Sequence, residues 1–255
     1  MSGDKRPVKL FWTGGWDSTF RLIQLTVIYG RIVQPYYILD PGRNSTLFEI
    51  KAMTKIKEML FLKYPQIKKL ILPTHYADLT GIPVVEEISQ SYMRLTKIET
   101  IGIQYEWLAR FCATKNITDM EISNETAIYD ADNRTRKLLG DDLDRIEITD
   151  EVYYKLNDKA KGKDVYNIYG CYKFPVFDFT KQDMYNLSLE MGFDDVMNLT
   201  WFCHMPTRFS KPCGKCHPCR VVYREGLKWR LPFVAKMRYH TWPTLRIIAR
   251  FLQKF

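Results

Sequence analysis

The stretch Trp12-Thr13-Gly14-Gly15-Trp16-Asp17-Ser18-Thr19 decides the expected fold of this chain. The apolar run before it, residues 8–12, predicts a buried strand, and residues 17–29 carry apolar side chains at helical spacing. Paired glycines between a strand and a helix let backbone N–H groups approach an anion, and the positive end of the helix dipole points at the same place. Three hydroxyl groups would add further donors, those of Thr13, Ser18 and Thr19. The stretch therefore predicts a phosphate-binding loop.

Short β-rich runs and helical stretches alternate through the first half of the chain. Strands are expected at residues 34–39, 69–73 and 119–123, and helices at residues 47–64 and 98–115. This alternation is typical of an α/β fold, a doubly wound parallel sheet with helices on both faces. Residues 125–164 are charged and helix-prone, and we expect them to cover the sheet. Thr180 and Asp183 have the spacing of a capping box, which predicts a helix from there to Gly192.

The composition fits a globular protein with a full hydrophobic core. Of the 255 residues, 46% are hydrophobic, and no apolar run reaches the roughly 18 residues that a membrane span needs. The polar N-terminus lacks the apolar segment of a secretory signal, so we expect a cytoplasmic protein. The net charge of +9 favours anionic substrates such as ATP. Nucleic acid is a less favoured partner, because much of the excess charge lies near the C-terminus.

Four of the six cysteines lie in one short window, at Cys203, Cys213, Cys216 and Cys219. The last three form two overlapping Cys-x2-Cys pairs, and Cys203 can complete a tetrahedron of ligands. In a reducing compartment this clustering indicates a metal site instead of disulfides. Zn²⁺ favours four thiolates in a closed structural site. An iron–sulfur cluster, which also takes four thiolates, is the competing interpretation.

The loop at residues 12–19 resembles the Ser-Gly-Gly-x-Asp-Ser loop of the ATP-pyrophosphatase (PP-loop) superfamily. Enzymes with this loop cleave ATP to AMP and pyrophosphate while they adenylate a carboxylate or a carbonyl oxygen. The segment 174–181 is similar to a second superfamily segment, which implies that Lys181 lies near the ATP phosphates. The resemblance implies that Asp17, Ser18 and Lys181 are catalytic. It also implies that ATP is bound by Thr13, Gly14, Gly15, Asp17, Ser18 and Thr19.

The loop and the cysteines together resemble one family of this superfamily, the 7-cyano-7-deazaguanine synthases (QueC). That family pairs its ATP loop with a C-terminal Cys-x8-Cys-x2-Cys-x2-Cys zinc site. The segment Asp40-Pro41-Gly42-Arg43 is similar to a family motif after the second strand, which implies that Arg43 belongs to the ATP site. The expected cofactors are ATP, Mg²⁺ and Zn²⁺.

The resemblance implies a reaction in which ATP adenylates the carboxylate of 7-carboxy-7-deazaguanine. Ammonia then displaces AMP to give an amide, and a second ATP activates the amide oxygen so that a nitrile forms. The expected partners are this acid and ammonia or another amine. The product could therefore be an amide, a nitrile or a conjugate with an amine on another molecule, including a protein.

We expect three parts in the chain, an ATP-binding α/β domain at residues 1–200, a zinc-binding segment at 201–231 and a basic tail at 232–255. Residues 244–255 have the spacing of an amphipathic helix, expected to pack on the sheet or on a second subunit of a homodimer. A membrane-surface helix and a site for an acidic partner are alternatives for this tail.

Two other functions remain open at this point. One is a PP-loop tRNA-modifying enzyme such as a thiolase, which iron with labile sulfide would favour. The other is a non-catalytic nucleotide-binding subunit of a larger assembly, which ATP binding without turnover would favour.

Overall fold

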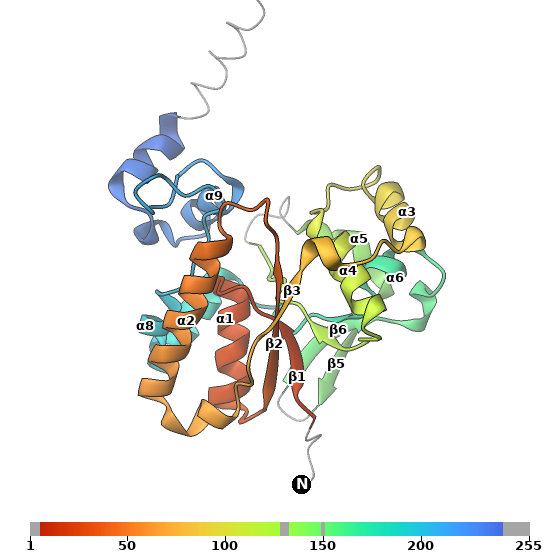
Figure 1. Ribbon diagram of the computed structural model, residues 1–255, viewed down its shortest axis with the longest axis horizontal. Coiled ribbons are helices and arrows are strands. Elements are labelled where there is room, and N and C mark those ends of the chain that lie inside the picture. Colours follow the sequence, from red (N-terminus) through yellow and green to blue (C-terminus); the bar gives the residue numbers. More distant parts are fainter. Residues whose placement is uncertain (1–5, 128–132, 149–150, 242–255) are drawn as a thin grey trace, which may run out of the picture.

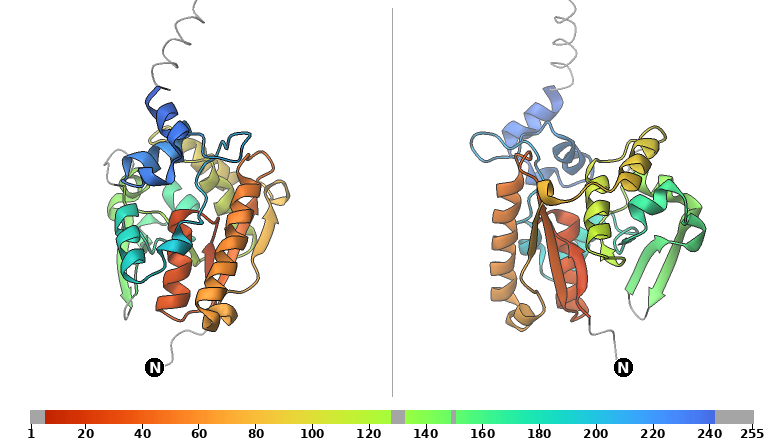
Figure 2. Two further views of the ribbon diagram at one scale, coloured as in Figure 1. Left: turned by 90° about the vertical axis from the view of Figure 1, so that its left-hand side faces the viewer. Right: turned by 45° about the vertical axis from the view of Figure 1, so that its right-hand side comes forward.

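The computed structural model describes residues 6–127, 133–148 and 151–241. Among the described residues, five strands form a parallel sheet in the order β3-β2-β1-β4-β7. The members are β1 (Val8–Phe11), β2 (Val33–Leu39), β3 (His75–Asp78), β4 (Met120–Glu121) and β7 (Tyr172–Lys173). Helices cover both faces of this sheet (Figures 1 and 2). The expected α/β class is therefore confirmed.

One face of the sheet carries the helix that follows the predicted phosphate-binding loop, residues 12–19 (hereafter the phosphate loop). The helices there are α1 (Trp16–Ile23), α2 (Thr46–Lys63), α7 (Lys181–Glu190) and α8 (Asp194–Met197). Nearly all of α1 is buried, and it continues directly into a π-helical turn at Gln24–Ile28. At the start of α7, the Thr180 hydroxyl accepts from the backbone of Asp183, whose carboxylate accepts from the backbone of Thr180. The predicted capping box is confirmed.

The other face carries a second hydrophobic cluster and an antiparallel hairpin. Its helices are α3 (Glu86–Leu95), α4 (Gln104–Thr114), α5 (Arg134–Leu139) and α6 (Asp164–Tyr169). The hairpin pairs β5 (Leu143–Ile148) with β6 (Glu151–Leu156). The cysteine segment, α9 (His217–Arg224) and a helix at residues 233–241 lie beyond the carboxyl ends of the strands (Figure 2).

No helix in the described ranges has both the length and the apolar character required to cross a lipid bilayer.

The third strand lies later in the chain than expected. Residues 69–73 do not form it, because Pro65–Lys69 makes a 3-10 turn and Ile71 forms only an isolated bridge with Val33. Strand β2 pairs instead with His75–Asp78, an edge strand with mostly exposed side chains. An exposed edge strand needs no apolar run, so hydrophobicity pointed to the wrong segment.

The middle of the chain also differs from the expectation. Residues 125–164 contain the hairpin β5–β6 as well as helices, because their charge reflected solvent exposure and not helical structure. Of the helix expected at 98–115, only Gln104–Thr114 forms α4, and α3 was not anticipated. The helix expected at 244–255 lies outside the described residues.

Arg21 ties α1 to the centre of the sheet. Its guanidinium donates to both carboxylate oxygens of Glu121, at 2.7 and 2.9 Å, and also to Gln24 and Glu151. Arg21 and Glu121 are 1% and 3% exposed, so water cannot replace either partner. This ion pair fixes α1, and with it the loop that precedes α1, relative to β4.

We predict that Arg21→Met lowers the free energy of unfolding by about 3–5 kcal/mol, because Glu121 would lose its buried partner. The matched control is Arg94→Met, which removes a solvent-accessible ion pair with Asp164 and should cost about 0–1 kcal/mol. Urea unfolding measures both values. A loss in Arg21→Met no larger than that in the control would contradict the assigned role.

Candidate active site

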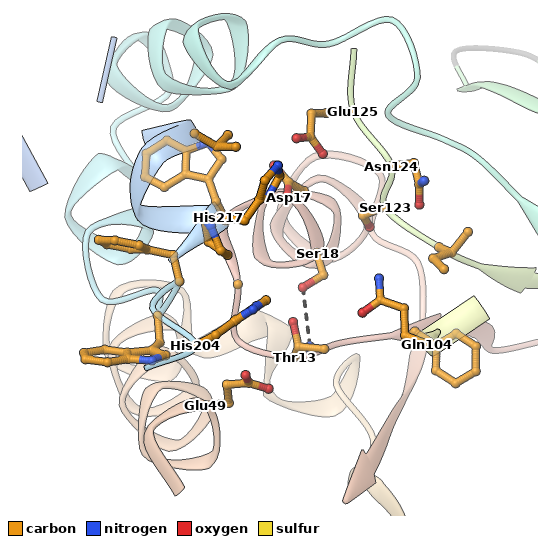
Figure 3. Close-up of a pocket in the computed structure, with 18 of the residues that line it drawn as sticks. Thr13, Asp17, Ser18, Glu49, Gln104, Ser123, Asn124, Glu125, His204 and His217 are labelled. Atoms are coloured by element: carbon orange, nitrogen blue, oxygen red, sulfur yellow. Dashed lines mark hydrogen bonds between the residues drawn. The ribbon is translucent and has the colours of Figure 1, made fainter. Parts of the chain in front are cut away.

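A cavity of about 360 Å³ opens at the carboxyl ends of β1, β2 and β4 (Figure 3). In open parallel sheets, ligands bind at this edge, because the loops that follow the strands meet there. The cavity walls come from the phosphate loop, α2, α4, the segment after β4, α7, the cysteine segment and α9. Of the predicted site residues outside the cysteine cluster, those that line it are Thr13, Gly15, Asp17, Ser18, Arg43 and Lys181.

The phosphate loop is shaped by its contact with α2. Gly14 has a φ of +66°, and a Cβ there would lie 2.9 Å from the Cγ of Met53 and 3.0 Å from the carbonyl oxygen of Glu49. Only glycine fits this position. Gly14 does not line the cavity, whereas Gly15 does, and α1 begins directly after Gly15. The first N–H groups of α1 have no partner within the helix and can therefore bind an anion.

Thr19 lies apart from the cavity. Its side chain is fully buried, and its hydroxyl accepts a hydrogen bond from the Trp12 indole N–H at 3.1 Å. The hydroxyl of Ser18, in contrast, lines the cavity and accepts from the backbone N–H of Thr13 (Figure 3). The structure therefore brings Thr13 and Ser18 to the cavity and places Thr19 in the core between β1 and α1.

Lys181 is buried and joins two partly buried carboxylates at the cavity wall. Its ammonium group lies 2.8 Å from Asp17 Oδ1 and also donates to Glu125. Asp17 follows β1, Glu125 follows β4, and Lys181 opens α7, so three separate segments meet at one charge cluster. Sequence reasoning singled out Asp17 and Lys181 but missed Glu125, which lies just beyond the strand expected at 119–123.

Burial and mutual charge set the protonation of this cluster. Burial raises the pKa of Asp17 to about 7, Glu125 adds to the rise, and Lys181 opposes it. Burial would also raise the pKa of Glu125, but Lys181 outweighs burial and holds that pKa below its usual range. Burial would lower the pKa of Lys181, yet the surrounding carboxylates raise it. Lys181 is therefore charged at neutral pH, beside one carboxylate that is readily protonated.

Arg43 lies on the side of the cavity opposite Lys181, where it belongs to a network of polar contacts with Glu49 of α2 and with His204. Its Nε lies 3.8 Å from Glu49 Oε1, and its Nη2 lies 3.2 Å from His204 Nε2. Glu49 is buried and accepts hydrogen bonds from Tyr37 and Ser45. These contacts hold a guanidinium at the cavity and link α2 to the cysteine segment.

The four predicted metal ligands converge. The Sγ atoms of Cys203, Cys213, Cys216 and Cys219 all lie within 4.8 Å of one another. Two of the S···S distances are 3.9 Å, close to the separation of about 3.8 Å that four thiolates at about 2.3 Å from a tetrahedral zinc would have. Backbone N–H groups of Cys213 and Cys216 point at sulfur, an arrangement that favours thiolates. A four-iron cluster would hold the sulfurs further apart, because each binds a different iron.

The cysteine segment is attached to the phosphate loop. The backbone N–H of Trp201 donates to the carbonyl oxygen of Gly14 at 2.9 Å, and the Trp201 ring stacks on Phe48 of α2 with centroids 4.7 Å apart. The Trp201 indole N–H also donates to the carbonyl of Cys203. A metal bound by the cysteines would therefore stabilise one wall of the cavity without lining it as a reactive centre.

Residues 158–228 match a family model described as "QueC: Queuosine biosynthesis protein QueC". The matched segment contains Lys181, the four cysteines and α9, whereas the phosphate loop lies outside it. No curated protein matches the chain. The match supports a QueC-like protein, and the four-cysteine cluster is compatible with zinc.

We predict that Lys181→Met destabilises the protein by about 3–5 kcal/mol at pH 8, because two partly buried carboxylates lose their counter-ion. The loss should be smaller at pH 5. Without the lysine, the paired carboxylates bind a proton more tightly in the folded variant than in its unfolded chain. The stability of the variant therefore falls as the pH rises above about 4.

Thermal unfolding without added magnesium or chelator at both pH values tests this prediction. The control is Lys163→Met, which removes an exposed ion pair with Asp142 and should have little effect at either pH. An equal loss for Lys181→Met at pH 5 and pH 8 would contradict it.

For the metal site, we expect about one zinc per chain in protein purified without chelators. Cys216→Ser should lose that zinc and lower the melting temperature, because metal binding is coupled to folding of the segment. Cys171→Ser is the control, since Cys171 lies outside the cluster and should leave zinc unchanged. Elemental analysis that finds iron with labile sulfide instead would refute the zinc assignment.

Proposed function

We propose that this protein is an ATP-dependent, AMP-forming enzyme that activates a 7-deazaguanine carboxylate for reaction with an amine. One observation carries the proposal: the anion-binding loop, the Lys181 cluster and the QueC-matching segment meet at a single cavity. Each feature alone is compatible with several functions. Their convergence at the ligand-binding edge of a parallel sheet favours an active site.

The ATP phosphates would lie against the loop. The backbone at Gly15 and the hydroxyls of Thr13 and Ser18 provide uncharged donors at the N-terminus of α1. Lys181 provides a positive charge on the adjoining wall. Donors already in place where negative charge develops stabilise the transition state of phosphoryl chemistry.

The charge cluster also fits Mg²⁺. Asp17 and Glu125 place two hard carboxylates beside one lysine, and the excess negative charge would be offset by a divalent cation. When bound with ATP, that ion would supply charge neutralisation on the phosphates.

In the proposed reaction a substrate carboxylate oxygen attacks the α-phosphorus of ATP, and pyrophosphate leaves with its bonding electrons. An acyl-adenylate results. An amine then attacks the acyl carbon, AMP departs, and the nitrogen loses a proton to give an amide. A nitrile would need a second ATP to activate the amide oxygen. The chain's contribution is to orient the two reactants and to exclude water, so no side-chain nucleophile is needed.

The acid has room beside the nucleotide. A second cavity of about 180 Å³ shares Tyr105, Asn124 and Glu125 with the first. The Asn124 amide donates to the Tyr105 hydroxyl at 2.6 Å, which fixes a polar edge beside an aromatic ring. A flat heterocycle with hydrogen-bonding edges suits such a chamber.

The alternative of a tRNA thiolase has less support. Among the described residues that line the cavity, none is a cysteine, and the four clustered cysteines suit a closed site. The Lys181 cluster favours an enzyme over a non-catalytic subunit, because charged groups with shifted pKa values that line a cavity are typical of active sites.

Mass spectrometry of the protein with ATP, magnesium, 7-carboxy-7-deazaguanine and ammonium tests the proposal. We predict AMP together with a new amide or nitrile mass. AMP without either mass would indicate that adenylation waits for a different amine, such as one on a protein. No AMP under any of these conditions would refute the proposed activation step.

We further predict that Asp17→Asn lowers the rate of AMP formation at least about 100-fold, because Asp17 would hold Mg²⁺ and Lys181 at the phosphates. Ser18→Ala should lower the rate at least about 10-fold, because it removes a donor to the developing charge. Asp158→Asn is the control, since Asp158 is exposed and pairs with the nearby Lys161. Measured rates that are the same for Asp17→Asn and for this control would exclude Asp17 from the chemistry.

A further inference from the structure

Arg230 lies at the cavity but outside the segment that matches the family model, which ends at residue 228. It closes a 3-10 turn at Lys228–Arg230, beyond the last cysteine. In the sequence, Arg230 falls at the end of the expected zinc-binding segment 201–231, and no role in the site was assigned to it. Because Arg230 lines the cavity, it is placed where a bound ligand would lie.

The guanidinium of Arg230 is held in a fixed plane. It lies over the Trp16 ring at 4.7 Å and over the Phe202 ring at 5.0 Å from the centroids. Its Nη2 donates to the carbonyl oxygen of Thr200 at 2.6 Å and to the Thr200 hydroxyl at 2.7 Å. One of these rings, Trp16, belongs to the phosphate loop itself. The aromatic contacts and the Thr200 anchor together fix the direction in which the remaining nitrogens point.

The Nη1 atom of Arg230 is buried and has no hydrogen-bond partner. An unsatisfied buried donor on a charged group is costly, so such an atom in a cavity wall indicates a place for a ligand. The other two cations of the cavity wall are engaged, Arg43 with Glu49 and Lys181 with Asp17 and Glu125. Within the described ranges, Arg230 forms no ion pair with a carboxylate, although Asp17 is close enough to influence it electrostatically. Burial lowers the pKa of Arg230 to about 10, which still leaves it charged at neutral pH.

We propose that Arg230 binds an anionic oxygen of the ligand through Nη1, and that this contact completes the anion site next to the phosphate loop. The inference deepens the proposed function, because the ligand oxygen belongs to a phosphate of ATP or to the carboxylate that ATP activates. A planar guanidinium with one edge anchored on protein and one nitrogen free is suited to a directed bond with an oxyanion. The residue comes from the chain's own C-terminal region, so ligand binding there would depend on the region beyond the cysteine cluster.

The test is calorimetric binding of two probes, inorganic pyrophosphate and 7-carboxy-7-deazaguanine, each to wild type, Arg230→Gln, Arg230→Lys and Lys228→Gln. Lys228 is an exposed lysine of the same 3-10 turn and controls for loss of one positive charge. We expect Arg230→Gln to weaken the binding of one probe by roughly ten- to a hundred-fold. Arg230→Lys should recover that loss only in part, because lysine lacks the planar fork. Lys228→Gln should bind both probes as wild type does.

Weaker pyrophosphate binding assigns Arg230 to a phosphate, and weaker binding of the acid alone assigns it to the carboxylate. Unchanged binding of both probes by Arg230→Gln overturns the inference. Failure of the wild-type protein to bind either probe overturns it as well. Circular dichroism melting of each variant separates loss of binding from loss of fold. A wild type that binds pyrophosphate through Arg230 yet forms no AMP would overturn the proposed function and leave this inference standing.

Discussion

The ammonium group of Lys181, held between the carboxylates of Asp17 and Glu125, is the interaction on which the site depends. It joins the loop after β1, the segment after β4 and the first residue of α7, three regions far apart in the sequence. A buried lysine is stable only when its charge is compensated, and two partly buried carboxylates this close together repel unless a cation separates them. The capping box at Thr180 and Asp183 sets where α7 begins, and so places the lysine. The start of α7, the carboxyl edge of the parallel sheet and the Lys181 charge cluster therefore depend on one another.

The cysteine cluster contributes to the same site from the outside. Its thiols do not line the cavity, but the hydrogen bond from Trp201 to Gly14 and the stacking of Trp201 on Phe48 connect the cluster to the loop and to α2. Gly214, with a φ of +78°, lies so close to Ala235 that a Cβ would meet its carbonyl oxygen at 2.1 Å. The cysteine segment therefore also packs against the helix at residues 233–241, which follows Arg230 in the chain. A structural metal would in this way stabilise a cavity wall that the sheet alone does not build.

Local signals in the sequence predicted the features that depend on neighbouring residues. Two glycines and hydroxyls after an apolar run indicated the loop, the cysteine spacing indicated the cluster, and Thr180 with Asp183 indicated the start of α7. Features that depend on tertiary contacts were missed. Glu125 and Arg230 carry no local pattern, because their environment is made by segments distant in the sequence. Thr19 matched the loop pattern yet lies in the core, since one position along a helix rotates a side chain by about 100°. The edge strand at His75–Asp78 has little apolar character, and so hydrophobicity could not locate it.

The central claim is that a substrate carboxylate attacks the α-phosphorus of ATP in this cavity. Transfer of ¹⁸O from a labelled carboxylate of 7-carboxy-7-deazaguanine tests it most directly, with the AMP product weighed by mass spectrometry. The account predicts that each AMP released in a productive turnover carries one ¹⁸O, because the carboxylate oxygen leaves with the adenylate. AMP that carries oxygen only from solvent water would contradict the account, since ATP would then be hydrolysed without activation of the acid.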